Sequence, residues 1–170
     1  MSAVHRSFLR EAEREAQACN RESGVLRLLG DPVSGHPPSR FHGLLREVQH
    51  FVREPGGAVH VSDDPIPFSI HLPEDYLRSV DPALQFRIVE LHAPLFHPNV
   101  RGPLVCMGSR FRPGTRLRSV VEHVYALFAS HVFATEDAFC PEARDFYRRH
   151  TARARSLQAA PLWRRPLAAR

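Results

Sequence analysis

The stretch His97-Pro98-Asn99-Val100-Arg101-Gly102-Pro103-Leu104-Val105-Cys106 is the most informative part of this chain of 170 residues. It places a cysteine a few residues after a His-Pro-Asn tripeptide and shortly before a Pro113-Gly114 turn. Cys106 itself lies between an apolar residue and the Met107-Gly108-Ser109 segment, so we expect it at the edge of a turn-rich loop. Two interpretations fit this position: an accessible, reactive thiol, or a buried structural one, which is common for free cysteine.

The sequence on either side of this stretch predicts an α+β fold. Apolar residues recur at helical spacing in three segments: residues 4–19, residues 117–128 and a last helix that begins at Pro141. Alternating or continuous apolar residues predict four strands, at 25–29, 41–52, 67–73 and 84–90. The cysteine segment is expected to contain no strand. This order predicts an antiparallel sheet covered by helices in one domain over residues 1–158, followed by an arginine- and proline-containing tail at 159–170.

The composition excludes several classes of protein. No apolar run approaches the roughly 20 residues of a membrane-spanning helix, and the N-terminus lacks the apolar core of a signal peptide. The three cysteines, Cys19, Cys106 and Cys140, form neither a disulfide framework nor a CxxC pair, which predicts reduced thiols in the cytoplasm. His92 and His97 have no thiolate or carboxylate at a spacing that completes a zinc site, so we expect no metal and no cofactor.

All 23 basic residues are arginine, and the net charge is +5. A GC-rich coding genome explains the absence of lysine and favours a bacterial source. A second explanation is functional: an enzyme that transfers an acyl group to amines gains from having no ε-amine of its own, because the arginine guanidinium stays protonated. Only residues 148–170 carry charges of a single sign, all of them positive. Trp163 alone does not supply the aromatic residues that alternate with basic ones on a nucleic-acid surface. We therefore expect no nucleic-acid partner.

The order of these motifs resembles that of the ubiquitin-conjugating enzyme family over residues 65–150, and by element order alone over the first 60. The matching segments are the strand and acidic-aromatic turn at 68–76, Phe86-Arg87-Ile88, the His-Pro-Asn tripeptide, the short apolar run ending at Cys106, Phe111 with Pro113, and the acidic segment 137–142. A His-Pro-Asn tripeptide alone occurs by chance, whereas the whole series in this order is specific.

The resemblance implies one N-terminal helix, a four-stranded antiparallel meander, an active-site loop and C-terminal helices. It implies that Cys106 receives a ubiquitin-like protein from an activating enzyme, carries it as a thioester and passes it to an amine of a protein target. In this scheme Asn99 stabilises the oxyanion, His97 holds the loop, and Asp137 orients or deprotonates the incoming lysine. Simpler roles also fit: an Asx turn at Asn99, and a solvated or helix-capping acid at Asp137.

The chain departs from the family's pattern at several positions. The interval from Asn99 to Cys106 is seven positions, one shorter than usual, and Phe111 and Ala138 replace a usual tryptophan and proline. These departures and the composition indicate a divergent member of a bacterial ubiquitin-like pathway, of the kind found in anti-phage operons. Two alternatives remain: a non-catalytic module that binds a ubiquitin-like protein, and a cysteine hydrolase, for which the sequence offers no clear histidine partner.

Overall fold

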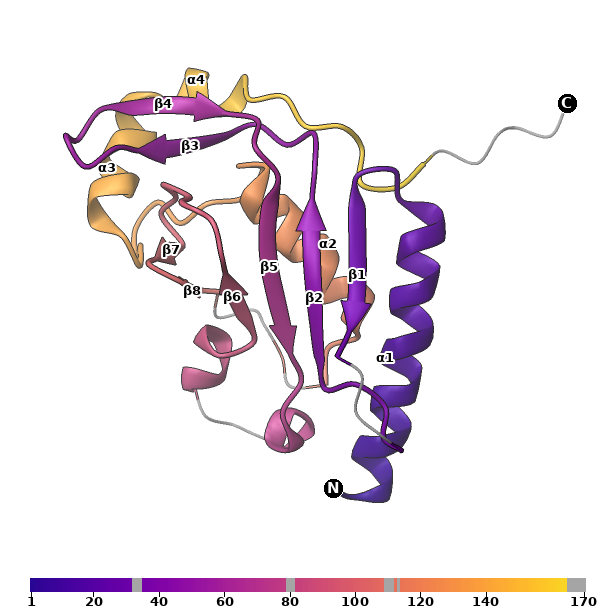
Figure 1. Cartoon of the computed structure of the whole chain (residues 1–170). Coiled ribbons are helices and arrows are strands. Elements are labelled where there is room, and N and C mark those ends of the chain that lie inside the picture. The colour runs from indigo at the N-terminus through magenta and orange to yellow at the C-terminus, as the bar shows by residue number, and fades with distance from the viewer. Residues whose placement is uncertain (32–34, 79–81, 109–111, 113, 165–170) are drawn as a thin grey trace, which may run out of the picture.

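The computed structural model describes residues 1–31, 35–78, 82–108, 112 and 114–164 of the chain. It has an α+β fold, in which an N-terminal helix precedes a mostly antiparallel sheet and further helices follow (Figure 1). The α+β prediction is therefore confirmed. Within the described part of the chain, no helix combines the length and the apolar character needed to cross a bilayer.

One sheet forms the centre of the molecule. Its described strands are each antiparallel to their neighbours, in the spatial order β1 (Leu26–Gly30), β2 (Arg40–Leu45), β5 (Ile66–His71), β6 (Val89–Leu91), β8 (Leu104–Val105) and β7 (Val100–Arg101). Strands β3 (His50–Arg53) and β4 (Val59–Ser62) form a separate hairpin, inserted in the sequence between β2 and β5.

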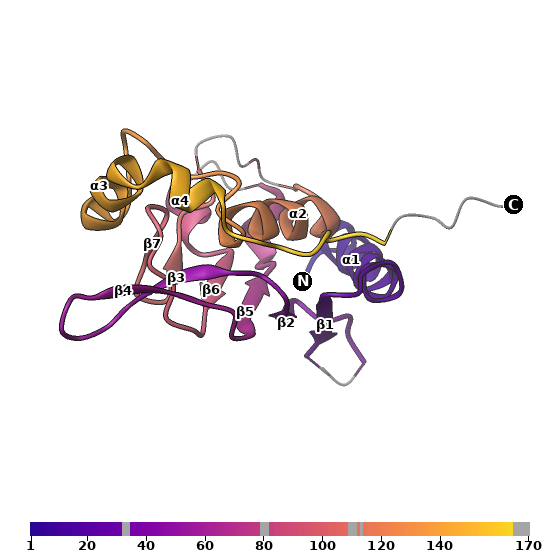
Figure 2. The same ribbon diagram turned by 90° about the horizontal axis from the view of Figure 1, so that it is seen from above.

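Two helices cover one face of this sheet and leave its other face open (Figure 2). Ser2 caps α1 (Ala3–Glu22), because its hydroxyl accepts a hydrogen bond from the His5 backbone N–H at 3.2 Å. Each helix buries one apolar stripe: Leu9, Ala12, Ala16 and Cys19 on α1, and Leu117, Val120, Val121, Val124, Leu127 and Phe128 on α2 (Leu117–Phe128). The helices expected at 4–19 and 117–128 are confirmed.

Close packing between β2 and the helices depends on Gly43. It lies opposite Phe68 of β5, and a Cβ atom at this position would stand 2.2 Å from Phe68 Cζ. The Phe68 ring occupies that space and meets Phe128 of α2 edge-on, with 5.8 Å between ring centroids. A larger residue at position 43 would displace this ring from the core.

Two of the expected strands are wrong. Residues 41–52 do not form one strand: β2 ends at Leu45 and β3 begins at His50, with Glu47 between them at a φ of 57°. Residues 84–90 begin as a 3-10 helix, η2 (Pro82–Phe86), and the strand begins only at Val89. Leu84 and Ile88 are both buried. Only Leu84 belongs to the 3-10 helix, and Ile88 lies in the bend that follows it, so two buried residues at an even spacing imitate one face of a strand.

The cysteine segment and the last helix also differ from expectation. The cysteine segment was expected to lack strands but contains β7 and β8, which extend the four-strand series β1–β2–β5–β6. The last helix is interrupted at His150 and forms α3 (Pro141–Arg149) and α4 (Thr151–Arg155). Phe111 and Pro113, two of the residues that carry the family resemblance, lie outside the described residues.

A second apolar cluster joins the inserted hairpin to α3. Phe51 of β3 meets the rings of Phe146 and Tyr147 edge-on, at 5.1 and 5.5 Å between centroids. Phe96, which directly precedes the His-Pro-Asn tripeptide, packs against this cluster, and its N–H donates to the Phe51 carbonyl at 2.7 Å. The cluster therefore fixes the start of the segment that leads to Cys106.

The last described residues return to the main core. Val48 forms an isolated antiparallel bridge with Ala159, and Leu162 is buried. Trp163 donates its indole N–H to Glu122 at 3.1 Å, and Arg118 stacks over its ring at 4.3 Å. Residues 159–164 thus lie along α2 and do not project from the domain.

Candidate functional site

The stretch from His97 to Cys106 folds as a turn followed by a tight hairpin. The Val100 N–H donates to the His97 carbonyl at 2.9 Å, which closes the His-Pro-Asn turn. Beyond it, Val100 pairs with Val105 and Arg101 with Leu104. Gly102 supplies the positive φ of 58° that this hairpin turn requires. A two-residue turn therefore places Asn99 beside Cys106.

Asn99 and Cys106 are joined through two hydrogen bonds. The Cys106 N–H donates to the Asn99 carbonyl at 2.8 Å, and the Asn99 side-chain Nδ2 donates to the Cys106 carbonyl at 3.2 Å. Asn99 Oδ1 accepts the Ala134 N–H at 2.9 Å, so both ends of this amide are held and its orientation is determined. Asn99 is 8% exposed, and Nδ2 carries a second N–H. The Asx-type structural role expected for Asn99 is thus present, and the amide lies next to the cysteine.

His97 is fully buried and stabilises the loop through its contacts with neighbouring residues. Its Nδ1 accepts the Asn99 N–H at 3.1 Å, and its ring meets Tyr147 edge-on at 5.3 Å. The ring proton therefore lies on Nε2, which has no partner of ordinary hydrogen-bond geometry among the described residues, although the Val132 carbonyl interacts with it weakly. Burial lowers the pKa of His97 to about 3, so the imidazole is neutral in the folded protein.

Cys106 is half-buried, at the base of the hairpin. Burial raises the pKa of its thiol above the usual value, against a smaller opposing effect of the Gly108 backbone N–H. No side-chain base or acid of the described residues contributes to this shift. Among the described residues no histidine is paired with this thiol, as a cysteine hydrolase would require, which weakens that alternative.

The acidic segment before α3 lies against the His-Pro-Asn turn. The Cys140 N–H donates to the Pro98 carbonyl at 2.9 Å, and the Phe139 ring lies 5.0 Å from that of Phe86. Asp137 is exposed on this segment, between Ala134 and Cys140. The structure therefore joins Asn99 both to His97 and to Cys106, and the acidic segment that contains Asp137 lies against the same turn.

The other two cysteines have structural surroundings. Cys19 is buried on α1, and burial raises its pKa to about 11. Cys140 is half-buried at the start of α3, and its thiol donates to Glu142 at 3.5 Å. Burial raises the pKa of Cys140 as well.

Sequence reasoning missed the contribution of the segment that follows α2. Ala134 orients the Asn99 amide through its backbone N–H, and Tyr147 supports His97 from α3. Ser130, whose φ of 57° is rare for a residue with a side chain, shares a 2.9 Å hydrogen bond with the Tyr147 hydroxyl. A backbone donor carries no signal in residue type, so Ala134 could not have been selected from the sequence.

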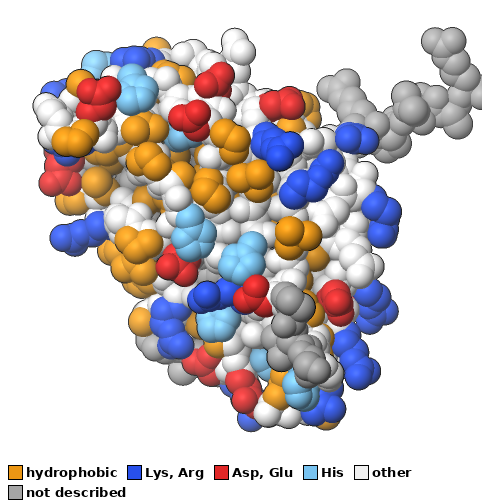
Figure 3. Space-filling view, viewed as in Figure 1, with side chains coloured by type: hydrophobic (Ala, Val, Ile, Leu, Met, Phe, Trp, Pro, Cys, Tyr) orange, Lys and Arg blue, Asp and Glu red, His pale blue; other side chains and the backbone are white. Residues whose placement is uncertain are grey.

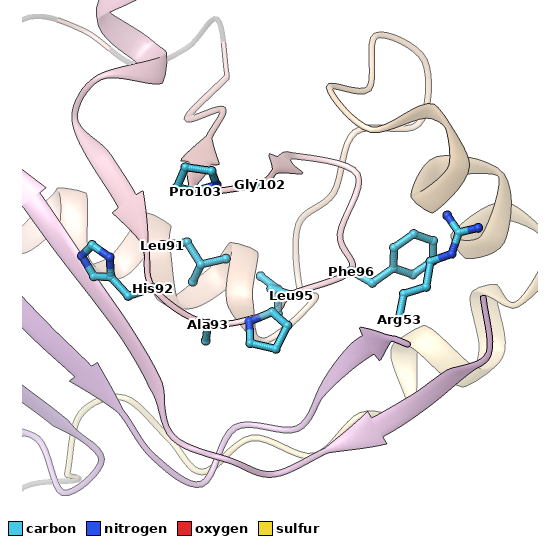
Figure 4. Close-up of a pocket in the computed structure, with 9 residues that line it drawn as sticks. Arg53, Leu91, His92, Ala93, Leu95, Phe96, Gly102 and Pro103 are labelled. Atoms are coloured by element: carbon cyan, nitrogen blue, oxygen red, sulfur yellow. The ribbon is translucent and has the colours of Figure 1, made fainter. Parts of the chain in front are cut away.

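A groove of about 400 Å³ lies beside the hairpin turn (Figure 4). It is mostly apolar and is lined by Arg53, His92, Gly102, Pro103 and the 91–96 segment. The Arg53 guanidinium lies 5.6 Å from the centre of the Phe96 ring. Because Gly102 and Pro103 line the groove, it adjoins the turn of the hairpin, at the end opposite to Cys106.

The described residues contain no cluster of three or more histidine, cysteine or acidic side chains that could hold a metal ion. No protein-family model matches the chain, and no curated protein matches its sequence at a significant level. A functional assignment therefore depends on the motif order and on the geometry of the site.

Proposed function

We propose that this chain is a ubiquitin-conjugating-type transferase, which carries a ubiquitin-like protein as a thioester on Cys106 and passes it to an amine of a protein target. The observation that carries the proposal is the hydrogen-bonded pairing of Asn99 with Cys106 inside the expected motif order. The ubiquitin-conjugating fold belongs to the same proposal. It is supported by the N-terminal helix, the adjacent series β1–β2–β5–β6, the cysteine segment and the helices that follow.

The proposed reaction has two acyl-transfer steps. The Cys106 thiolate attacks the thioester that joins the ubiquitin-like protein to its activating enzyme, and the cysteine thiolate of that enzyme leaves. A target amine then attacks the new thioester, and the tetrahedral oxyanion collapses to an amide with the Cys106 thiolate as leaving group. The amine loses one proton in this step, and Asp137 is the candidate acceptor. The second N–H of Asn99 Nδ2 is the candidate donor to the oxyanion, a role that is worth about 3 kcal/mol in other acyl transfers.

The surroundings of Cys106 suit a carrier more than a hydrolase. A thiol whose pKa is raised by burial is a poorer leaving group than a free one, so its thioester is discharged slowly unless an amine is positioned. The absence of lysine is also consistent, because the chain offers no ε-amine to its own thioester. The absence of lysine favours a bacterial source, and together with the resemblance it leads us to place the chain in a bacterial ubiquitin-like pathway of the anti-phage type.

The test is thioester formation. The protein is incubated with its cognate activating enzyme, the ubiquitin-like protein and ATP, and the products are separated on non-reducing gels. We expect a thiol-sensitive adduct that is lost in Cys106→Ala, becomes thiol-resistant in Cys106→Ser, and persists in the matched control Cys140→Ala. Absence of an adduct with an activating enzyme that charges its own cysteine would disprove the transferase.

A second candidate function is a non-catalytic module that binds a ubiquitin-like protein on the same fold. It is favoured by the half-burial of Cys106 and by the use of the Asn99 amide in holding the loop. The module predicts equal binding of the ubiquitin-like protein by the wild type and by Cys106→Ala, with no covalent adduct from either.

A further inference from the structure

The open face of the sheet carries a chain of four hydrogen-bonded side chains. Asp31 Oδ1 lies 2.8 Å from His42 Nε2, His42 Nδ1 lies 3.0 Å from Ser69 Oγ, and Ser69 Oγ lies 2.8 Å from His92 Nε2. These residues come from the end of β1, from β2, from β5 and from the end of β6, so the chain crosses the sheet. Several histidine side chains are visible on this face of the molecule (Figure 3).

We call these four side chains the relay. When both imidazoles are neutral, every hydrogen bond in the relay donates toward Asp31. A carboxylate only accepts, so the His42 proton lies on Nε2 and points to Asp31. His42 Nδ1 is then an acceptor and takes the Ser69 hydroxyl proton. Ser69 Oγ in turn accepts from His92 Nε2–H, which leaves His92 Nδ1 as an unprotonated acceptor.

The order Asp-His-Ser does not make Ser69 a nucleophile. Ser69 is 2% exposed in the middle of β5, where strands pair on both of its sides, so a substrate cannot reach its hydroxyl. The neighbouring backbone N–H groups belong to the sheet ladders and offer no oxyanion hole. The hydroxyl can, however, reverse its direction without any movement of the backbone.

We propose that this relay is a proton switch, in which one proton taken up by His42 converts Nδ1 of His92 from a hydrogen-bond acceptor to a donor. Protonated His42 donates to Asp31 through Nε2 and to Ser69 through Nδ1. The Ser69 hydroxyl must then donate to His92 Nε2, so the proton of neutral His92 moves to Nδ1. His92 is exposed and borders the groove beside Gly102 and Pro103 (Figure 4). Protonation of His42 therefore changes the hydrogen-bonding character of His92 at the edge of this groove.

A second proton is opposed by the same geometry. With both imidazoles charged, Ser69 receives two N–H donors and its own O–H has no acceptor within the relay. The inference does not depend on the activity of Cys106.

Charged and titratable groups lie near both ends of the relay: His36 lines a pocket together with Asp31, and Arg53 lines the groove together with His92. On this face β2 adds Arg40, whose guanidinium lies 3.9 Å from Glu90 of β6, and β5 adds His71. Burial, followed by Arg40 and Arg87, lowers the pKa of His71, whereas Asp75 and Glu90 oppose this shift. Strand β1 places Leu29 opposite His42, and its Arg27 is turned toward the Ser23 and Leu26 carbonyls. Asp31 is thus the carboxylate in contact with His42.

The test is a pH titration of the full chain by NMR, with ¹⁵N-labelled histidine rings assigned from His42→Gln and His92→Gln. At pH 8 we expect both His42 and His92 as neutral rings protonated on Nε2. On acidification His42 becomes charged, and at the same midpoint His92 changes to the Nδ1–H tautomer. Ser69→Ala should abolish the tautomer change, whereas Ser69→Thr should retain it. His60, which pairs with Glu54 at 3.4 Å away from the relay, is the internal reference and keeps one midpoint in all variants.

Three outcomes would overturn the proposal. The first is an Nδ1–H tautomer of His92 at pH 8. The second is a His92 tautomer that does not change as His42 takes up its proton. The third is a Ser69→Ala variant whose folded spectrum shows the wild-type coupling.

Discussion

The Asn99 amide donates to the Cys106 carbonyl at 3.2 Å, while the Asn99 carbonyl accepts the Cys106 N–H at 2.8 Å. This double link continues the β7–β8 ladder by one residue pair beyond Val100 and Val105. The two-residue turn at Gly102 and Pro103 sets the interval of seven positions between the asparagine and the cysteine. This interval of seven positions is thus the length that a tight hairpin requires.

Replacement of Asn99 should separate loop stability from catalysis. Asn99→Ala removes two hydrogen bonds and should lower the free energy of unfolding by about 1–3 kcal/mol. If the transferase proposal holds, it should also slow discharge of the Cys106 thioester to an amine by about 100-fold, with loading less affected. Urea unfolding and single-turnover discharge on gels measure the two effects.

Asn20 offers the matched control for this variant. Its side chain holds the Leu28 backbone through two hydrogen bonds of 2.7 Å, far along the chain from the cysteine. Asn20→Ala should therefore cost similar stability but leave discharge unchanged. Equal discharge rates in both variants would assign Asn99 a purely structural role.

His97 should make the protein less stable in acid. Its folded pKa of about 3 lies below the 6.5 of an unfolded histidine, so the unfolded chain binds one more proton between these values. Stability from the neutral, buried ring is complete above pH 6.5 and is lost as the pH falls toward 3, with a limit on the order of 5 kcal/mol.

The measurement for His97 is urea unfolding at several pH values between 7 and 4. His97→Asn keeps an acceptor near the Asn99 N–H but does not titrate, so its stability should fall less steeply with acid than that of the wild type. The exposed His60→Asn serves as control and should keep the wild-type slope. A His97→Asn slope equal to the wild type's would show that the buried ring does not govern the acid limit.

Gly43→Ala should destabilise the main core. The added Cβ would meet the Phe68 ring at 2.2 Å, so Phe68 must move out of its contact with Phe128. We expect a loss of about 1–3 kcal/mol in the free energy of unfolding. Gly56→Ala, where a Cβ meets nothing within 4 Å, is the control in the same chain and should change stability little. Thermal and urea unfolding of the two variants give the comparison.

The Cys106 thiol should react slowly with alkylating agents near neutral pH. Burial raises its pKa, and the thiolate is the reactive form, so its alkylation by iodoacetamide at pH 7 should be slower than that of the unfolded chain. The rate should rise close to tenfold per pH unit up to the pKa. Cys140→Ala simplifies the analysis, because Cys19 is buried. A rate at pH 7 above that of free cysteine would contradict a thiol of raised pKa.

Local pattern predicted the elements whose apolar residues face one core. The stripes of α1 and α2 agree with the structure, since burial on one side of a helix imposes a period that the sequence displays. The strand expected at 67–73 is β5, although Ser69 on its polar side is buried as well. The pattern failed at 84–88, where the chain forms a 3-10 helix up to Phe86 and then a bend, although Leu84 and Ile88 are both buried as in a strand. It also failed at 41–52, where one apolar run crosses from the central sheet to a separate hairpin.

The sequence by itself determined the α+β class, the two long helices and the position of a cysteine seven residues after an asparagine. Only the tertiary structure decided that Ala134 holds the Asn99 amide and that His97 is buried and neutral. It alone also aligned Asp31, His42, Ser69 and His92 across the sheet. The physical reason is that periodicity reports which side of an element is buried. Backbone donors, strand register and the loss of solvent around a ring arise only when distant segments pack together.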